Sequence, residues 1–174
     1  MTLEPDQLAE QGKQAFKNKK FDEAAELFSQ AAEGYTLSHA GLLMSAEMRN
    51  NVSVALLQAG KPQESLTAAL YTDQIFADAK DVKRQGMALG NQAAALEALN
   101  RYDEAIEKYD LAAQLFGQAG EGDLRALVMK SSAAIKLKTG KVTDSAFKMM
   151  GSLDAKDNPS LFERILKFFL RFIK

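Results

Sequence analysis

The sequence predicts an all-α protein, and three observations carry this prediction. Proline and glycine, which interrupt helices, number only 3 and 11 among 174 residues, and 47% of the residues are hydrophobic. Alanine, leucine, glutamine, glutamate and lysine dominate the composition, and these residues favour helices. A motif with helical spacing also recurs along the chain. The length suits one domain with a continuous core.

The recurring motif is clearest in two places. Residues 20–32 read KFDEAAELFSQAA and residues 101–113 read RYDEAIEKYDLAA. Each copy has an aromatic residue, an acidic pair, an alanine, a second aromatic position and two alanines. The acidic pair suits the first turn of a helix, where the helix dipole attracts negative charge. Alanines seven positions apart share one face, so a neighbouring helix can approach closely.

Two weaker copies complete a series with a fixed period. Ala24, Ser65, Ala105 and Ser145 hold the same place in successive copies. The intervals between them are all about 40 residues, and a constant period in this range is typical of a solenoid. A second apolar-periodic helix ending in a basic turn precedes each copy. We therefore expect four helix-turn-helix repeats, at about residues 5–37, 38–77, 78–118 and 121–150, which we call copies one to four.

The predicted elements follow in order. Pro5 suits the first position of a helix over residues 5–18. The first helices of the later copies are expected at residues 38–59, 80–99 and 121–138. Second helices are expected at residues 21–35, 62–77, 102–118 and 142–150, with Leu70 pointing inward. A polar linker at residues 151–158 separates this 5–150 region from a last segment, residues 159–174.

The helix pairs resemble the tetratricopeptide repeat (TPR) family. In copy three the matching residues are Ala93, Leu96, Tyr102, Ala105, Tyr109 and Ala112, and in copy one they are Gly12, Ala15, Phe21, Ala24, Phe28 and Ala31. The family's tryptophan near the start of the first helix and its closing proline are absent. The period also exceeds the family's usual length of about 34 residues. The resemblance implies a right-handed superhelical solenoid with lengthened, roughly 40-residue repeats.

The resemblance also implies a binding surface along the first helices. In the family, an asparagine two places before the small residue of the first helix often holds a peptide backbone, and Asn51 and Asn91 occupy that place. An amide can donate and accept hydrogen bonds. The alternative interpretation is that both are solvated helix amides. Further residues expected along this concave, peptide-binding groove are Lys13, Met44, Val54, Leu57, Met87, Lys130 and Leu137.

The segment at residues 159–174 has a different character. From residue 160 it reads SLFERILKFFLRFIK, and on a helix its charged residues fall within a sector of about 100°. We consider three interpretations of this predicted amphipathic helix: a cap on the last repeat, a helix in the groove of its own chain or a second copy, and insertion into a membrane surface. Its apolar face comprises Leu161, Phe162, Ile165, Phe168, Phe169 and Phe172.

Composition argues against several functions. The chain has no cysteine, one histidine, His39, and a net charge of −1. Metal-ligand spacing and phosphate-loop motifs are absent, so we expect no catalytic residues, metal or cofactor. The balanced charge favours no nucleic acid partner. Without a signal sequence or a run of about 18–20 apolar residues, a cytoplasmic protein is expected, with a membrane-peripheral location as the alternative.

The expected function is therefore a non-catalytic protein-interaction scaffold or adaptor that binds a protein partner as a peptide or helix. The runner-up is a peripheral membrane protein docked through residues 159–174. Association of two copies into a homo-oligomer through the same segment is a third expectation about partners. The sequence does not identify the partner.

Overall fold

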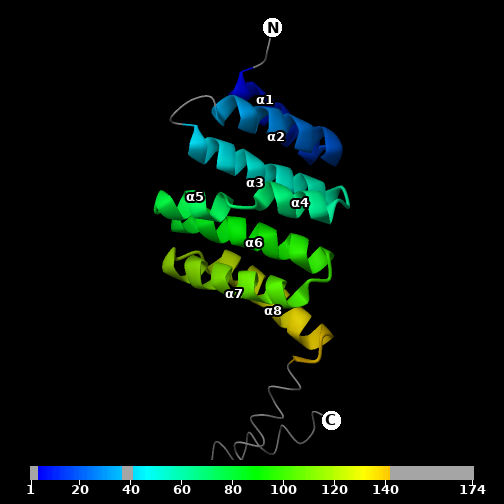
Figure 1. The fold of residues 1–174 in the computed structure, drawn as a ribbon, viewed down its shortest axis with the longest axis vertical. Coiled ribbons are helices and arrows are strands. Elements are labelled where there is room, and N and C mark those ends of the chain that lie inside the picture. Colours follow the sequence, from blue (N-terminus) through cyan, green and yellow to red (C-terminus); the bar gives the residue numbers. More distant parts are fainter. Residues whose placement is uncertain (1–3, 37–40, 142–174) are drawn as a thin grey trace, which may run out of the picture. The chain divides into compact units, whose positions relative to one another are not determined.

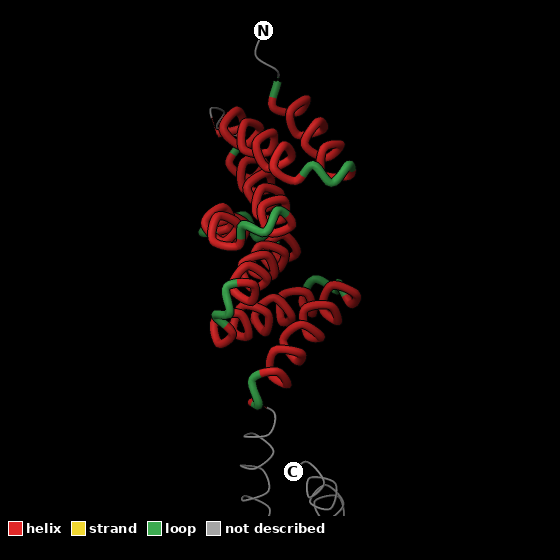
Figure 2. The backbone as a smooth tube through the Cα atoms, turned by 90° about the vertical axis from the view of Figure 1, so that its right-hand side faces the viewer, coloured by secondary structure: helices red, strands yellow, loops and turns green. Residues whose placement is uncertain are grey.

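A computed structural model describes residues 4–36 and 41–141. Every regular element in these ranges is an α-helix (Figure 2), which confirms the predicted all-α class. The chain forms two compact units, residues 1–132 and 133–174. The predicted helix at residues 142–150, the linker and the C-terminal amphipathic helix lie outside the described residues, and so does His39.

The first unit contains α1 (Pro5–Lys17), α2 (Phe21–Thr36), α3 (Leu42–Gln58), α4 (Pro62–Ala69), α5 (Thr72–Asp78), α6 (Val82–Ala98) and α7 (Tyr102–Gln118). The helix α8 (Gly122–Lys138) begins in the first unit and ends in the second. Pro5 and Pro62 each open a helix, as expected of a residue with a fixed φ and no amide proton. Within the first unit, α1 packs on α2, α2 on α3, α3 on α4, α5 on α6 and α6 on α7 (Figure 1).

The turns recur with the same period as the motif. Lys19, Gly60, Asn100 and Gly140 all have positive φ angles between 59° and 76°, and they follow α1, α3, α6 and α8. After the first three of these helices, the next amide donates to the carbonyl five positions back over 2.9 Å. This bonding pattern is the Schellman motif, which satisfies the last carbonyls of a helix. The sequence period is therefore also a period of backbone conformation.

Small residues let the paired helices approach closely. Ala24, Ala31, Ala105 and Ala112 are fully buried. A Cβ atom added to Gly12 would lie 2.8 Å from the ring of Phe28, and one added to Gly86 would lie 2.9 Å from the ring of Phe116. Both distances are shorter than van der Waals contact, so each glycine leaves room for an aromatic ring of the second helix.

The prediction of one continuous helix at residues 62–77 is wrong. The structure divides this stretch into α4 and α5, and Tyr71 between them has a φ of 66°. Leu70, which we expected to point inward, is 38% exposed. No proline or glycine marks the break, which is why helix-stop signals in the sequence did not reveal it. Side chains of neighbouring helices donate hydrogen bonds to carbonyls at the break.

Candidate binding groove

A groove of about 480 Å³ lies between α3 and α6. Four of the residues predicted to line a binding surface meet in it, namely Asn51 and Val54 from α3 and Met87 and Asn91 from α6. The other lining residues are Glu47, Asn50, Phe76, Asp81, Lys83 and Arg84. Two first helices thus bring together residues that lie one repeat apart in the sequence.

Helical spacing explains how the groove is lined. Glu47, Asn51 and Val54 follow one another at intervals of four and three residues, so they share one face of α3. Arg84, Met87 and Asn91 are related in the same way on α6.

Both predicted asparagines keep hydrogen-bonding capacity for a partner. The Asn51 side-chain nitrogen has a sulfur contact of 4.0 Å to Met48, and a thioether is a weak acceptor. Within residues 4–36 and 41–141, the side chain of Asn91 makes no hydrogen bond. Both residues are partly exposed. Each amide can therefore offer donors and an acceptor to a bound chain.

The charges at the polar end of the groove are balanced. The guanidinium of Arg84 lies 3.2 Å from a carboxylate oxygen of Glu47 on α3 and 3.3 Å from one of Asp81. Asp81 also caps α6, because its other oxygen accepts a 3.0 Å hydrogen bond from the amide of Arg84. Lys83 pairs with Glu121 over 2.6 Å. Ion pairs as exposed as these are weak, so they can exchange partners with little loss.

A second groove of about 300 Å³ continues on the other side of Met87 and Asn91, which line both. It lies among α6, α7 and the part of α8 in the first unit, and most of its lining is apolar. Leu127 is 61% exposed there. Besides Met87, Asn91 and Leu127, the lining residues are Gly90, Ala94, Tyr109, Phe116, Leu124, Val128 and Ser131.

Tyr109 is the main polar group beneath this apolar groove. Its hydroxyl donates a 2.9 Å hydrogen bond to Glu97 of α6. Burial, followed by this hydrogen bond, raises the pKa of Tyr109 well above its ordinary value. An ordinary tyrosine is already protonated at neutral pH, and the raised pKa keeps this hydroxyl a donor to Glu97 at more alkaline pH as well.

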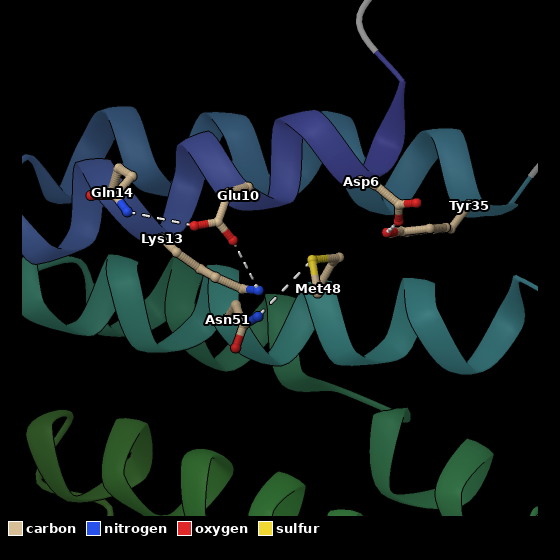
Figure 3. Close-up of polar contacts among 7 residues, drawn as sticks. All are labelled: Asp6, Glu10, Lys13, Gln14, Tyr35, Met48 and Asn51. Atoms are coloured by element: carbon tan, nitrogen blue, oxygen red, sulfur yellow. Dashed lines mark hydrogen bonds and ion pairs between the residues drawn. The ribbon is translucent and has the colours of Figure 1, made fainter.

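Five predicted residues line neither groove. Lys13 is exposed on α1 and pairs with Glu10 over 3.4 Å, and its side chain extends in the direction of Asn51 in Figure 3. Met44 is exposed near the start of α3, and Leu57 is half-buried near its end. Lys130 and Leu137 are exposed on α8, and Leu137 belongs to the second unit.

Sequence reasoning missed both ends of the surface. Glu47 and Arg84 at the polar end share the helical faces of Asn51 and Asn91, so extending the i, i+4, i+7 spacing would have found them. Tyr109, Leu124 and Leu127 at the apolar end were missed for another reason. They come from a second helix and from the next first helix, and their convergence depends on packing between helices.

A further hollow of about 470 Å³ between α1 and α2 contains none of the predicted residues. In the described part of the chain, no group of three or more histidine, cysteine, aspartate or glutamate side chains could hold a metal ion. No helix among the described residues is long and apolar enough to cross a membrane.

The chain matches no model of a known protein family, no curated protein and no solved structure.

Proposed function

We propose that this chain is a non-catalytic protein-interaction scaffold or adaptor of the TPR type, which binds a peptide or helix along its first helices. The proposal includes a right-handed solenoid of four lengthened repeats and a cytoplasmic location. One observation supports the binding role above all others. Asn51, Val54, Met87 and Asn91, selected by their place in the repeat, line one groove between α3 and α6.

The two grooves suggest what the partner looks like. The amides of Asn51 and Asn91 suit the backbone of an extended chain, because they donate and accept without selecting a side chain. Met87 and Leu127 offer adaptable apolar contacts for a hydrophobic side chain. The paired charges of Glu47, Asp81 and Arg84 favour uncharged polar groups at the other end. The partner is therefore a segment with an apolar anchor next to uncharged polar residues.

Selection from a random peptide library on the intact chain tests this function. Selected peptides are then titrated by calorimetry against the wild type and a double variant, Asn51→Ala with Asn91→Ala. Each lost amide hydrogen bond is worth about 1 kcal/mol, so the double variant is expected to bind about 10–100 times more weakly. Gln114→Ala, an exposed change on α7 outside both grooves, serves as the control and is expected to keep full affinity.

Two results would contradict the proposal. Failure to select any peptide would argue against peptide binding, and undiminished affinity of the double variant would place the peptide elsewhere on the chain. A loss of affinity in the Gln114→Ala control would show that the assay reports a general disturbance of the fold.

The alternative function is docking on a membrane surface through residues 159–174. The observation that favours it is the sequence of this segment, in which four cations lie beside a wide face of leucine, isoleucine and phenylalanine. Flotation of the chain with vesicles containing anionic lipid tests the idea. Flotation that disappears on deleting residues 159–174 would support it, whereas no flotation of the intact chain would eliminate it.

A further inference from the structure

Two of the backbone carbonyls that the break between α4 and α5 deprives of their helical partners accept hydrogen bonds from side chains instead. The carbonyl of Ala69 accepts from the hydroxyl of Thr72 over 2.8 Å and from the side-chain amide of Gln92 over 3.0 Å. The carbonyl of Leu70 accepts from Arg49 over 2.8 Å. In an uninterrupted helix both carbonyls would accept from amides four residues further on. The break is therefore a bonded structure and not a frayed end.

The same side chains join three helices. The hydroxyl oxygen of Thr72 on α5 lies 2.9 Å from the amide oxygen of Asn50 on α3, so its one proton is shared between Asn50 and Ala69. The amide nitrogen of Gln92 on α6 also donates to Asp73 over 2.8 Å. Asn50, Thr72 and Gln92 are buried. We call Asn50, Thr72, Asp73 and Gln92, with the Ala69 carbonyl, the polar joint.

Among copies one to three, whose second helices the structure describes, only copy two has the residues of the polar joint. The register of the recurring motif shows which residues hold the places of Asn50, Thr72, Asp73 and Gln92 elsewhere. Around copy one they are Ala9, Ala31, Ala32 and Val52, and around copy three they are Gly90, Ala112, Ala113 and Ser132. Seven of these eight residues are apolar or glycine. Four polar residues thus coincide at one place in the chain, where the helix is broken and where they bond one another.

The joint adjoins the candidate groove, because Asn50 belongs to the joint and also lines the groove. Asn50 precedes Asn51 on α3, and Gln92 follows Asn91 on α6. Neighbouring residues on a helix point about 100° apart. A bond that fixes the direction of Asn50 or Gln92 therefore also fixes the direction in which its neighbour faces the groove. Because α3 and α6 pack on one another, the joint sets the rotation of both helices.

We propose that the polar joint is a positioning device that holds α3 and α6 in the rotation at which Asn51 and Asn91 face one groove. Its members act through those two asparagines, so this inference rests on the proposed function. It predicts that removing one buried hydroxyl beside the groove displaces amides that line it.

Thr72→Val tests the inference, because valine keeps the shape of threonine and lacks the hydroxyl. Thr72 does not line either groove. The readout is the position of the Asn51 and Asn91 side-chain amide resonances in NMR spectra of the intact chain, which a general loss of stability would not move. Thr72→Ser keeps the hydroxyl and is the rescue variant. Ser65→Ala is the control, since the Ser65 hydroxyl is equally buried but bonds only to Ser53.

Thr72→Val is expected to shift both amide resonances and to speed backbone amide exchange at residues 69–73 by roughly tenfold, because opening of the break becomes easier. Thr72→Ser and Ser65→Ala are expected to leave both resonances in place. Resonances that stay unmoved in Thr72→Val would overturn the inference, and so would equal shifts in Ser65→Ala.

A folding failure of Thr72→Val would not end the test. Thr72→Ala carries the residue found at Ala31 and Ala112 in the unbroken copies, and it is judged by the same shifts. The measurement needs no partner. A failed peptide selection would therefore contradict the proposed function and leave the joint intact, whereas unmoved resonances would contradict the joint alone.

Discussion

The second helix of copy two differs from the second helices of copies one and three at one position of the recurring motif. Phe28 in α2 and Tyr109 in α7 put an aromatic ring against the first helix, and both helices continue unbroken. Copy two has Ala69 there, and the helix stops at that residue. A methyl group is much smaller than a ring, and at this place copy two has the polar joint, which includes the Ala69 carbonyl.

This difference shows that a helix pair can be closed in two ways. Ring packing is local, because it needs one aromatic residue and a small residue opposite, as with Phe28 and Gly12. The polar joint is not local, because its bonds reach the first helix of the next copy through Gln92. The ring contact therefore lies within one copy, whereas the polar joint ties copy two to the first helix of copy three.

The largest expected effect comes from giving copy one the residue of copy two. Phe28→Ala removes a buried ring from the core and should lower the free energy of unfolding by about 3–5 kcal/mol. The helix α2 should nevertheless stay unbroken, since Leu8, Ala9 and Val52 stand where Arg49, Asn50 and Gln92 stabilise the break. Urea unfolding and the far-ultraviolet circular dichroism of the folded variant measure the two effects.

Phe16→Ala is the matched control for this prediction. Phe16 is a half-buried phenylalanine in the same helix pair, so a clearly smaller loss is expected. A loss for Phe28→Ala no larger than that of the control would contradict the view that the ring closes copy one.

Much of the fold could be predicted because residues close to each helix start in the sequence mark that start. Pro5, Pro62 and the aromatic-acidic motif mark helix starts, and α1, α2, α4 and α7 begin where these signals predict. The break at Leu70 and Tyr71 could not be predicted in this way. Two of the side chains that bond its carbonyls belong to α3 and α6 and lie far from it in the sequence.

The candidate site likewise has residues that helical spacing predicts and residues that depend on packing between helices. Asn51, Val54, Met87 and Asn91 follow a helical face, so the repeat pattern located them. The apolar groove depends on Tyr109 and Leu127 meeting Met87 across three helices, and one-dimensional spacing contains no such information. The role of Asn50 and Gln92 was hidden for a similar reason, because a buried polar residue can be recognised as a bridge only when its partner is known.

Enlarging the small residue that faces Phe116 should have the next largest effect on the free energy of unfolding. Gly86 faces Phe116, whereas Ala46 holds the same place in copy two and packs with Phe76. Gly86→Ala puts a Cβ 2.9 Å from the Phe116 ring and should lower the free energy of unfolding by about 1–3 kcal/mol. Gly90→Ala, where the nearest side-chain atom is 3.7 Å away, is the control. Equal stability of the two variants in urea would contradict the tight fit at Phe116.

Two glycine substitutions, one at the broken helix and one in an unbroken helix, should change the free energy of unfolding in opposite directions. Tyr71 has a left-handed backbone, so Tyr71→Gly relieves strain and should raise the free energy of unfolding by up to about 1 kcal/mol. Leu111 holds the same place inside α7, where Leu111→Gly should lower it by about 1 kcal/mol. Both side chains are at least 40% exposed, which limits packing losses. Thermal unfolding of both variants measures the difference, and shifts in the same direction would contradict the assigned backbone.

The smallest expected effect is a change in how the free energy of unfolding depends on pH. It concerns the motif position that Tyr35 holds in copy one, Phe76 in copy two and Phe116 in copy three. Burial first, then a hydrogen bond to Asp6 and the charges of Asp6 and Glu47, raise the pKa of Tyr35 to about 12. The unfolded chain ionises this tyrosine near its ordinary pKa of about 10, so the contribution of Tyr35 is complete below pH 10 and is lost as the pH rises toward 12. Tyr35→Phe, which introduces the residue of the other two copies, should remove this loss. The stability difference between wild type and variant in urea should therefore change by less than about 1 kcal/mol between pH 8 and pH 10.5, with the wild type falling faster. A difference that stays constant over this range would show that Tyr35 titrates alike in the folded and unfolded chain.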